Sequence, residues 1–330
     1  MLKVVVAVLT TFGACSANVV FLEHLVKYSP GCGDIIAFAQ FLFTSCYGFV
    51  AIAKFGSKKP VVPIKEYVVG VLLFFGTTVA GNLALGCNIS MPIQMIFKSG
   101  SVLASLTLGV LLLKKSYPVS KYVSVVMISV GIAMCLLVSA DDKQSTEEKS
   151  SKNEYLVWLF GIFLLLTSLF MGATLGVVQE NMAVTYGKQP DEMLFYSHAL
   201  ALPGFLFFGS NIIQQSKIFS NSEMYPVPYI SVQIPIVWLY LVLNVLTQFV
   251  CIRSVYVLAT EVSALALTVI LTLRKFMSLM ISIYYFNNPF TIYHWCGTAL
   301  VFGGTLLFSG VIQSLANTLR GSLDTKKKEE

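Results

Sequence analysis

The amino-acid sequence predicts an all-α membrane protein with ten transmembrane helices, and its composition and its apolar runs carry that prediction. The chain has 330 residues, of which 56% are hydrophobic and only 12% are charged, with a mean hydropathy of +0.78. Soluble domains carry about 25% charged residues, so the composition excludes a soluble enzyme. Each apolar run is continuous, whereas the strands of an outer-membrane barrel would alternate polar and apolar residues. The sequence therefore also argues against a membrane β-barrel.

Ten apolar runs, separated by polar, proline or glycine breaks, give the elements in order. A helical span needs about 20 apolar residues, so ten spans leave room only for short loops. The first run follows Lys3 in the manner of a signal peptide, but nine runs come after it, so we expect a retained helix. Pro203 should kink the seventh helix. The expected spans are residues 4–25, 33–53, 66–86, 91–113, 119–139, 155–184, 192–213, 233–253, 262–285 and 290–314.

The distribution of basic residues predicts how the helices are oriented. An even number of spans places both termini on one side, and most Lys and Arg residues outside the spans fall on that side. Cytosolic segments are enriched in basic residues, so both termini are expected in the cytosol. Lys327 and Lys328 precede two C-terminal glutamates and match a dilysine retrieval signal, which coat proteins read. We therefore expect residence in the endoplasmic reticulum or Golgi membrane.

A shared spacing in the fourth and ninth spans predicts an internal repeat. In each, a lysine is followed by serines three and seven residues later, starting at Lys98 and at Lys275. Because five spans separate the two, the halves must have opposite topology, as in the inverted repeats of many secondary transporters. The prolines that open the next spans have a different offset, so we expect the lysines at different depths. The expected division is 1–139 for the first five-helix repeat, 140–154 for a flexible lumenal linker, 155–314 for the second repeat and 315–330 for a cytosolic tail.

Basic residues that lie well inside a predicted span mark the candidate site, and these are Lys98, Arg274 and Lys275. Arg253 ends its span and can reach the membrane surface, so it is not counted among them. A charge near the bilayer centre costs at least about 2.5–3.5 kcal/mol on insertion scales, so such residues are functional candidates. Two interpretations stay open, since the cations either bind an anionic ligand in a cavity or form ion pairs that lock helices together. The acids available for such pairs are Glu23, Glu180 and Glu261.

Polar side chains gather near these charges. Tyr240, Asn244 and Gln248 share one helix face by their spacing, and so do Thr272 and Lys275. In lipid such groups need internal partners, which are either neighbouring helices or a bound polar ligand. Lysine and arginine with hydroxyls suit phosphate oxygens, while tyrosines and amides suit a base or a sugar. We therefore expect a phosphorylated, base-bearing metabolite as the ligand.

The cysteines and histidines show no pattern of a metal site, a cofactor or a disulfide. The seven cysteines are scattered without a C-x-x-C pair, so we interpret them as small apolar residues in helices. The three histidines are too dispersed for a metal site. The net charge of +6 follows from topology and the site, and does not indicate nucleic acid. Gly297, Gly303 and Gly304 permit close helix packing, either within the chain or in a homo-oligomer.

Two function classes compete on these observations. A membrane-embedded enzyme acting on a nucleotide or lipid substrate would need acid–base or metal residues near one membrane face. The sequence has no Asp-x-x-Asp pair, no His-Cys cluster and no Ser-His-Asp set that would serve. A transporter for phosphorylated metabolites is therefore favoured over an enzyme, and a channel or regulatory role comes third.

Nine stretches are informative when taken together, namely residues 13–23, 30–33, 38–43, 91–92, 95–101, 194–200, 247–253, 273–276 and 288–291. As a set they resemble the nucleotide-sugar transporters of the drug/metabolite transporter superfamily, within solute carrier family 35, subfamily B. The resemblance runs nearly end to end and breaks down in the loop at 141–154 and in the last dozen residues. It implies exchange of a cytosolic nucleotide sugar for a lumenal nucleoside monophosphate by alternating access. UDP-N-acetylglucosamine or UDP-xylose is the implied cargo, and GDP-fucose or a broad specificity is the alternative.

The resemblance also implies roles for individual residues. The motif at 273–276 would contact phosphate and sugar. Tyr196, Ser197 and His198 align with a motif whose two asparagines read guanine in GDP-mannose carriers, and their replacement here fits uracil better. Lys98 stands where relatives often have arginine. The expected substrate-binding set is Lys98, Ser101, Tyr196, Ser197, His198, Asn244, Gln248, Thr272, Arg274, Lys275 and Ser278.

Overall fold

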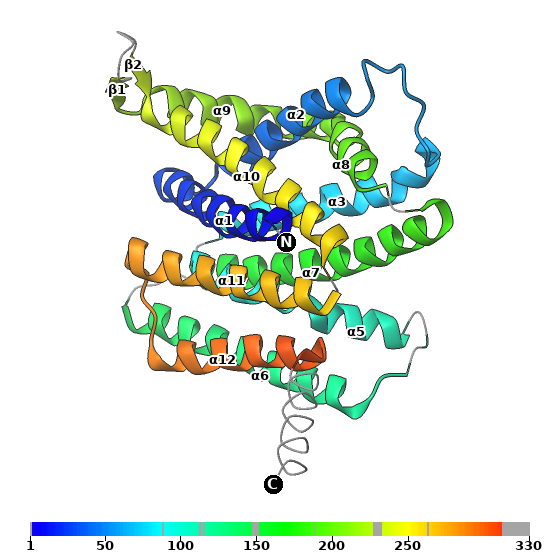
Figure 1. Ribbon diagram of the computed structural model, residues 1–330. Coiled ribbons are helices and arrows are strands. Elements are labelled where there is room, and N and C mark those ends of the chain that lie inside the picture. Colours follow the sequence, from blue (N-terminus) through cyan, green and yellow to red (C-terminus); the bar gives the residue numbers. More distant parts are fainter. Residues whose placement is uncertain are drawn as a thin grey trace.

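The computed structural model describes residues 2–87, 89–111, 114, 116–146, 152–187, 189–226, 233–262 and 264–311, so the expected tail with Lys327 and Lys328 lies outside the described residues. The described part is a bundle of helices (Figure 1). In chain order the elements are α1 (Leu2–Tyr28), α2 (Gly33–Ala51), α3 (Ile64–Leu85), α4 (Met91–Ser99), α5 (Ser101–Leu111), α6 (Val119–Thr146), α7 (Lys152–Tyr186), α8 (Pro190–Ala199), the 3₁₀ helix η1 (Leu202–Phe208), α9 (Gly209–Ser220), β1 (Met224–Pro226), β2 (Gln233–Pro235), α10 (Ile236–Glu261), α11 (Ala264–Phe286) and α12 (Ile292–Phe308).

The prediction of an all-α membrane protein is confirmed, with a short antiparallel hairpin of β1 and β2 added before α10. Within the described residues, nine helical segments are long and apolar enough to cross a membrane. The apolar helix α12, with 17 residues, occupies the expected tenth span.

Two of the spans are interrupted. The fourth divides into α4 and α5 at Gly100, where a Cβ would lie 2.5 Å from the Cδ1 of Ile132 on α6. The lack of a side chain at Gly100 therefore allows α6 to approach closely. The seventh span divides into α8, η1 and α9, and Pro203 stands in the first turn of η1. Because proline supplies no N–H to the helix ladder, the kink expected at Pro203 is confirmed.

The connector between the two predicted halves is shorter than the expected 140–154. Helix α6 continues to Thr146, and α7 already begins at Lys152. The predicted spans 119–139 and 155–184 are limited to the apolar residues of these two helices. No proline or glycine occurs between Ile132 and Glu154, so nothing stops the backbone from staying helical beyond the apolar segment.

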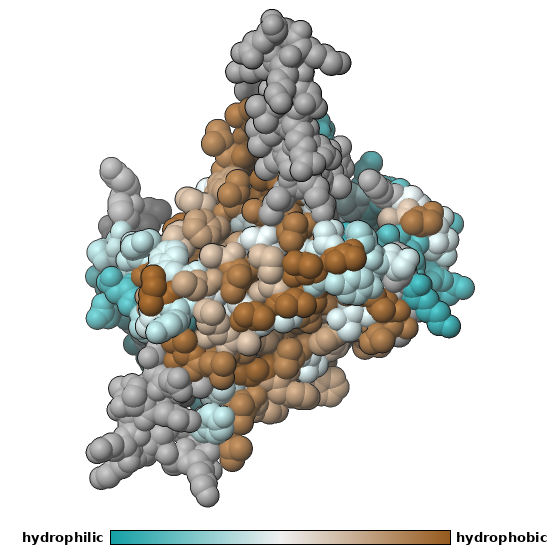
Figure 2. All heavy atoms as spheres, turned by 90° about the horizontal axis from the view of Figure 1, so that it is seen from below, coloured by the Kyte–Doolittle hydropathy of each residue, from teal (hydrophilic) through white to brown (hydrophobic). Residues whose placement is uncertain are grey.

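Apolar side chains cover the outside of the bundle. Leu72 on α3, Val126 on α6 and Phe163 on α7 are each more than 60% exposed. Figure 2 shows one such face, brown across its centre and teal at the left and right edges. Water would oppose so large an apolar surface, so this surface faces lipid and the teal edges face the aqueous phases.

The helices pair in a two-fold pattern (Figure 1). Helix α1 packs against α10 and α11, while α7 packs against α3 and α5. If the ten spans are numbered in chain order, α1 is span 1, α7 is span 6, and α10 and α11 are spans 8 and 9. Adding five to each number, and starting again from one after ten, turns the pairs 1–8 and 1–9 into 6–3 and 6–4. These are the pairs that α7 forms with α3 and with α5, which belongs to the fourth span. The pairs α6–α12 and α2–α8 map onto themselves under the same shift. The pattern is the one expected if span n of the first half corresponds to span n + 5 of the second, as in a five-plus-five repeat.

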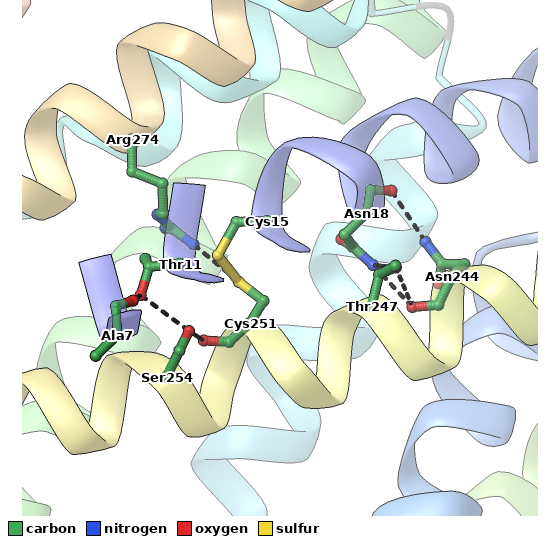
Figure 3. The surroundings of a disulfide bond; sticks show 9 residues. All are labelled: Ala7, Thr11, Cys15, Asn18, Asn244, Thr247, Cys251, Ser254 and Arg274. Carbon is green, nitrogen blue, oxygen red and sulfur yellow. Dashed lines mark hydrogen bonds between the residues drawn. A yellow bond between two sulfur atoms is a disulfide. The ribbon is translucent and has the colours of Figure 1, made fainter. Parts of the chain in front are cut away.

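A ladder of polar contacts and a disulfide joins α1 to α10 (Figure 3). The cysteines of the disulfide are 236 residues apart in the chain. The expectation that every cysteine is an unpaired apolar residue is therefore wrong, because sequence spacing does not reveal which helices are neighbours. The rungs of the ladder are Thr11 Oγ1 to Ser254 Oγ at 2.9 Å, the Cys15–Cys251 bond, and Asn18 Nδ2 to the carbonyl of Asn244 at 2.9 Å.

Glycines bring α6 and α12 into close contact. A Cβ on Gly297 would lie 2.7 Å from the carbonyl oxygen of Gly131, and a Cβ on Gly304 would lie 2.9 Å from that of Ser124. At Gly303 the nearest atom to such a Cβ is 3.9 Å away. Two of the three glycines singled out for close packing are thus used inside the chain.

This geometry predicts that Gly304→Ala destabilises the protein, while Gly303→Ala on the same helix does not. The added methyl at position 304 meets backbone, which cannot rotate away, so the cost should be about 1–3 kcal/mol. The melting temperature of the purified variants in detergent measures this. Equal melting temperatures for the two variants would show that α6 and α12 do not pack as described.

Candidate functional site

A cavity of about 410 Å³ lies inside the bundle, between helices of both predicted halves: α1, α2, α3, α4, α7, α10 and α11. Its apolar wall includes Met91, Met95 and the Cys15–Cys251 disulfide. Its remaining surface is unusually polar for the interior of a membrane protein. The side chains that supply this polarity are Asn18, Gln40, Thr77, Thr78, Asn82, Gln94, Lys98, Ser168, Gln248, Arg274, Lys275 and Ser278.

The three cations that the sequence singled out all line this cavity. Lys98 lies in the last turn of α4, where the break at Gly100 ends the helix. Arg274 and Lys275 lie in the middle of α11, and all three residues line the cavity. No Asp or Glu is among the described residues of the lining. The cavity therefore has a strong excess of positive charge, which an anionic ligand would neutralise.

Arg274 has few protein partners. One of its terminal N–H groups donates to the sulfur of Cys251 at 3.4 Å, which is a weak acceptor (Figure 3). Its Nε is buried without a hydrogen-bond partner in the described part of the chain. A guanidinium held in this way keeps most of its donors available for a ligand.

The acids proposed as partners of these cations are occupied elsewhere. Glu23 is fully buried and accepts hydrogen bonds from Ser282 Oγ and Asn288 Nδ2, while Glu261 pairs with Lys3. Glu180 is exposed. The ion pairs found among the described residues do not include Lys98, Arg274 or Lys275. Among the residues that the structure describes, the basic centre is therefore not a helix-locking ion pair.

Amide side chains from α1, α2 and α10 form a second part of the wall. Asn244 is fully buried, and its Oδ1 accepts a hydrogen bond at 2.8 Å from Gln40 Nε2. Its Nδ2 donates to the carbonyl of Asn18 at 3.2 Å. Asn244 thus does not line the cavity but holds Asn18 and Gln40, which do. Both were missed, although a lone amide inside an apolar run is a signal that could have found them.

Five of the eleven predicted site residues line the cavity, namely Lys98, Gln248, Arg274, Lys275 and Ser278. Thr272 is buried within α11, and Ser101 begins α5 beyond the break; neither is part of the lining.

The α8 residues expected to read the base also lie away from the cavity. His198 is buried against the rings of Phe41 and Phe74, at 4.7 and 5.0 Å between centroids, and its Nδ1 is 2.7 Å from the carbonyl oxygen of Leu194. Tyr196 stacks on Tyr67 at 5.1 Å. Ser197 is half-buried and is not in the lining either. The sequence resemblance alone could not show that these side chains pack into an aromatic cluster.

Known proteins similar to this chain are transporters. A zebrafish (Danio rerio) protein named UDP-xylose and UDP-N-acetylglucosamine transporter is 48% identical, over 98% of each chain. The human protein named nucleotide sugar transporter SLC35B4 is 47% identical, over 94% of this chain and 95% of its own. A Drosophila melanogaster protein named endoplasmic reticulum GDP-fucose transporter is 44% identical, over 98% of this chain and 95% of its own.

A solved crystal structure shares the fold, with a TM-score of 0.50 at 13% identity, covering 92% of this chain and 98% of that one. The model of the UAA transporter family matches residues 3–312, which is nearly the whole chain. The chain therefore belongs to the UAA transporter family, and is a transporter rather than an enzyme.

Proposed function

We propose that this protein carries a nucleotide sugar across the membrane, in exchange for a nucleoside monophosphate, with both termini in the cytosol. The observation that carries the proposal is the group of Lys98, Arg274 and Lys275 in a cavity without a carboxylate in its described lining. Phosphate oxygens are the ligand groups that such cations recognise best. The neutral amides and hydroxyls of the remaining wall suit the base and the sugars.

The names of the relatives indicate which nucleotide sugars are candidates for the transported substrate. A protein 48% identical bears the name of a UDP-xylose and UDP-N-acetylglucosamine transporter, so UDP-xylose and UDP-N-acetylglucosamine are the first candidates. The relative named for GDP-fucose is 44% identical, and it keeps GDP-fucose as the second candidate. The diphosphate is common to all three cargoes, which fits a shared basic centre.

Exchange by alternating access fits the arrangement of the helices. The cavity lies between helices of both predicted halves, residues 1–139 and 155–314, and the helix pairs exchange under a shift of five spans. In an inverted repeat of this kind the halves open the central site alternately to either side. A returning nucleoside monophosphate would offer a phosphate to the same cations.

Lys275→Ala tests the phosphate assignment. Removing one charged donor should lower nucleotide-sugar uptake by at least about tenfold, while Lys275→Arg should keep part of the activity because the charge remains. Uptake into liposomes that are preloaded with UMP measures the effect. Lys121→Ala is the control, since the Lys121 ammonium lies 4.8 Å from the ring centroid of Phe308 and is not part of the lining. Wild-type exchange by a folded Lys275→Ala protein would refute the assignment.

We also propose retention in the endoplasmic reticulum or early Golgi membrane, where coat proteins would bind Lys327 and Lys328. The name of the Drosophila relative supports this location. Replacing both lysines by alanine should move the protein to later compartments, as seen by microscopy of a chain tagged at its N-terminus. Replacing Glu329 and Glu330 by glutamine keeps both lysines and should change nothing. An unchanged distribution of the lysine variant would refute the signal.

A further inference from the structure

We propose that Thr77, Asn82 and Gln94, the α3–α4 wall, form the subsite for the sugar ring that is carried, apart from the site for the base. The inference rests on the proposed function. All three side chains line the cavity, and none of them carries a charge. Thr77 and Asn82 lie on α3 and Gln94 lies on α4, whereas the amides of Asn18, Gln40 and Gln248 come from α1, α2 and α10.

Gln94 presents a fixed acceptor. The residue is only 2% exposed, and its Nε2 donates to the carbonyl of Ile89 at 3.1 Å. That bond fixes the orientation of the amide, so Oε1 is left as a hydrogen-bond acceptor. Oε1 is buried and has no partner among the residues that the structure describes. A buried acceptor is costly unless something donates to it, and a hydroxyl or an acetamido N–H would do so.

Thr77 presents a hydroxyl in the same condition. Its Oγ1 is buried without a partner in the described ranges, whereas the hydroxyl of the next residue, Thr78, donates to the carbonyl of Phe74 at 2.9 Å. The backbone of Thr77 is held from α7, because Ser168 Oγ donates to its carbonyl oxygen at 3.0 Å. The backbone of Thr77 is thus held in place, while its buried hydroxyl makes no hydrogen bond among the described residues.

The position of Gln94 relative to the basic centre points to a sugar ring. Gln94 and Lys98 are four residues apart on α4, so they lie on one face about 6 Å apart along the axis. A group that reaches Gln94 while its phosphate contacts Lys98 must therefore be attached almost directly to that phosphate. In a nucleotide sugar two rings are attached to the diphosphate, the ribose and the carried sugar, whereas the base is separated from it by the ribose. We assign the wall to the carried sugar, and a reaction with UMP, which keeps the ribose and lacks the second sugar, distinguishes the two.

A comparison of two exchange reactions tests the subsite, because UMP contains the ribose, the base and a phosphate but no second sugar. The variants are Gln94→Leu and Thr77→Val, which keep size and remove the polar atoms. Thr107→Val is the control, because the Thr107 hydroxyl on α5 donates to the carbonyl of Leu103 away from the cavity. The measurements are the KM for UDP-N-acetylglucosamine and UDP-xylose uptake and the rate of UMP–UMP exchange in liposomes.

We expect each variant of the wall to raise the KM of the nucleotide sugars by about tenfold, with UMP exchange and the control unchanged. Retained UMP exchange also shows that the variant is folded. An equal loss of both reactions would assign the wall to the ribose or phosphate, and no change in either would remove it from binding. Both results overturn the subsite but leave the proposed function standing. Failure of the wild-type chain to exchange any nucleotide would overturn the proposed function and the subsite together.

Discussion

The structure depends on one electrostatic constraint, which is that three cations share a cavity within the bilayer without a carboxylate beside them in the described lining. Lys98 and the adjacent Arg274 and Lys275 come from different halves of the chain and repel one another. Three unpaired positive charges in a low-dielectric interior cost free energy. A bound anion would neutralise them and offset that cost. The polar wall, the position of the cavity between the halves and the membership of a transporter family all fit this requirement.

The surrounding helices hold that arrangement open. The ladder between α1 and α10 fixes one side of the cavity, and its disulfide places the Cys251 sulfur within 3.4 Å of Arg274 (Figure 3). Fully buried Asn244 extends the same ladder to the amides of Asn18 and Gln40. Away from the cavity, close glycine contacts join α6 to α12. A binding site for a mobile ligand requires a rigid wall, which the paired helices supply. It also requires charged groups that are left available for the ligand, which the three cations supply.

The sequence predicted the spans and the basic centre because each rests on a local property. Apolar length defines a span, and a charge such as Lys275 inside one is visible without any knowledge of neighbours. Features that depend on which helices meet were missed or wrong. The Cys15–Cys251 pair, the aromatic packing of His198 and the occupation of Glu23 by Ser282 and Asn288 are of this kind. The close contact between Gly100 and Ile132 on α6 is also tertiary, and the sequence alone does not show it.

The central claim is that the cavity is completed by a ligand's phosphate. Thermal unfolding of the purified protein in detergent, at low ionic strength and with equal concentrations of UMP or uridine, tests it most directly. A ligand that binds only the folded state raises the melting temperature. The charge arrangement predicts that UMP raises it and that uridine, which differs only by the phosphate, leaves it nearly unchanged. Equal shifts with the two ligands, or no shift with UMP, would contradict the role assigned to Lys98, Arg274 and Lys275.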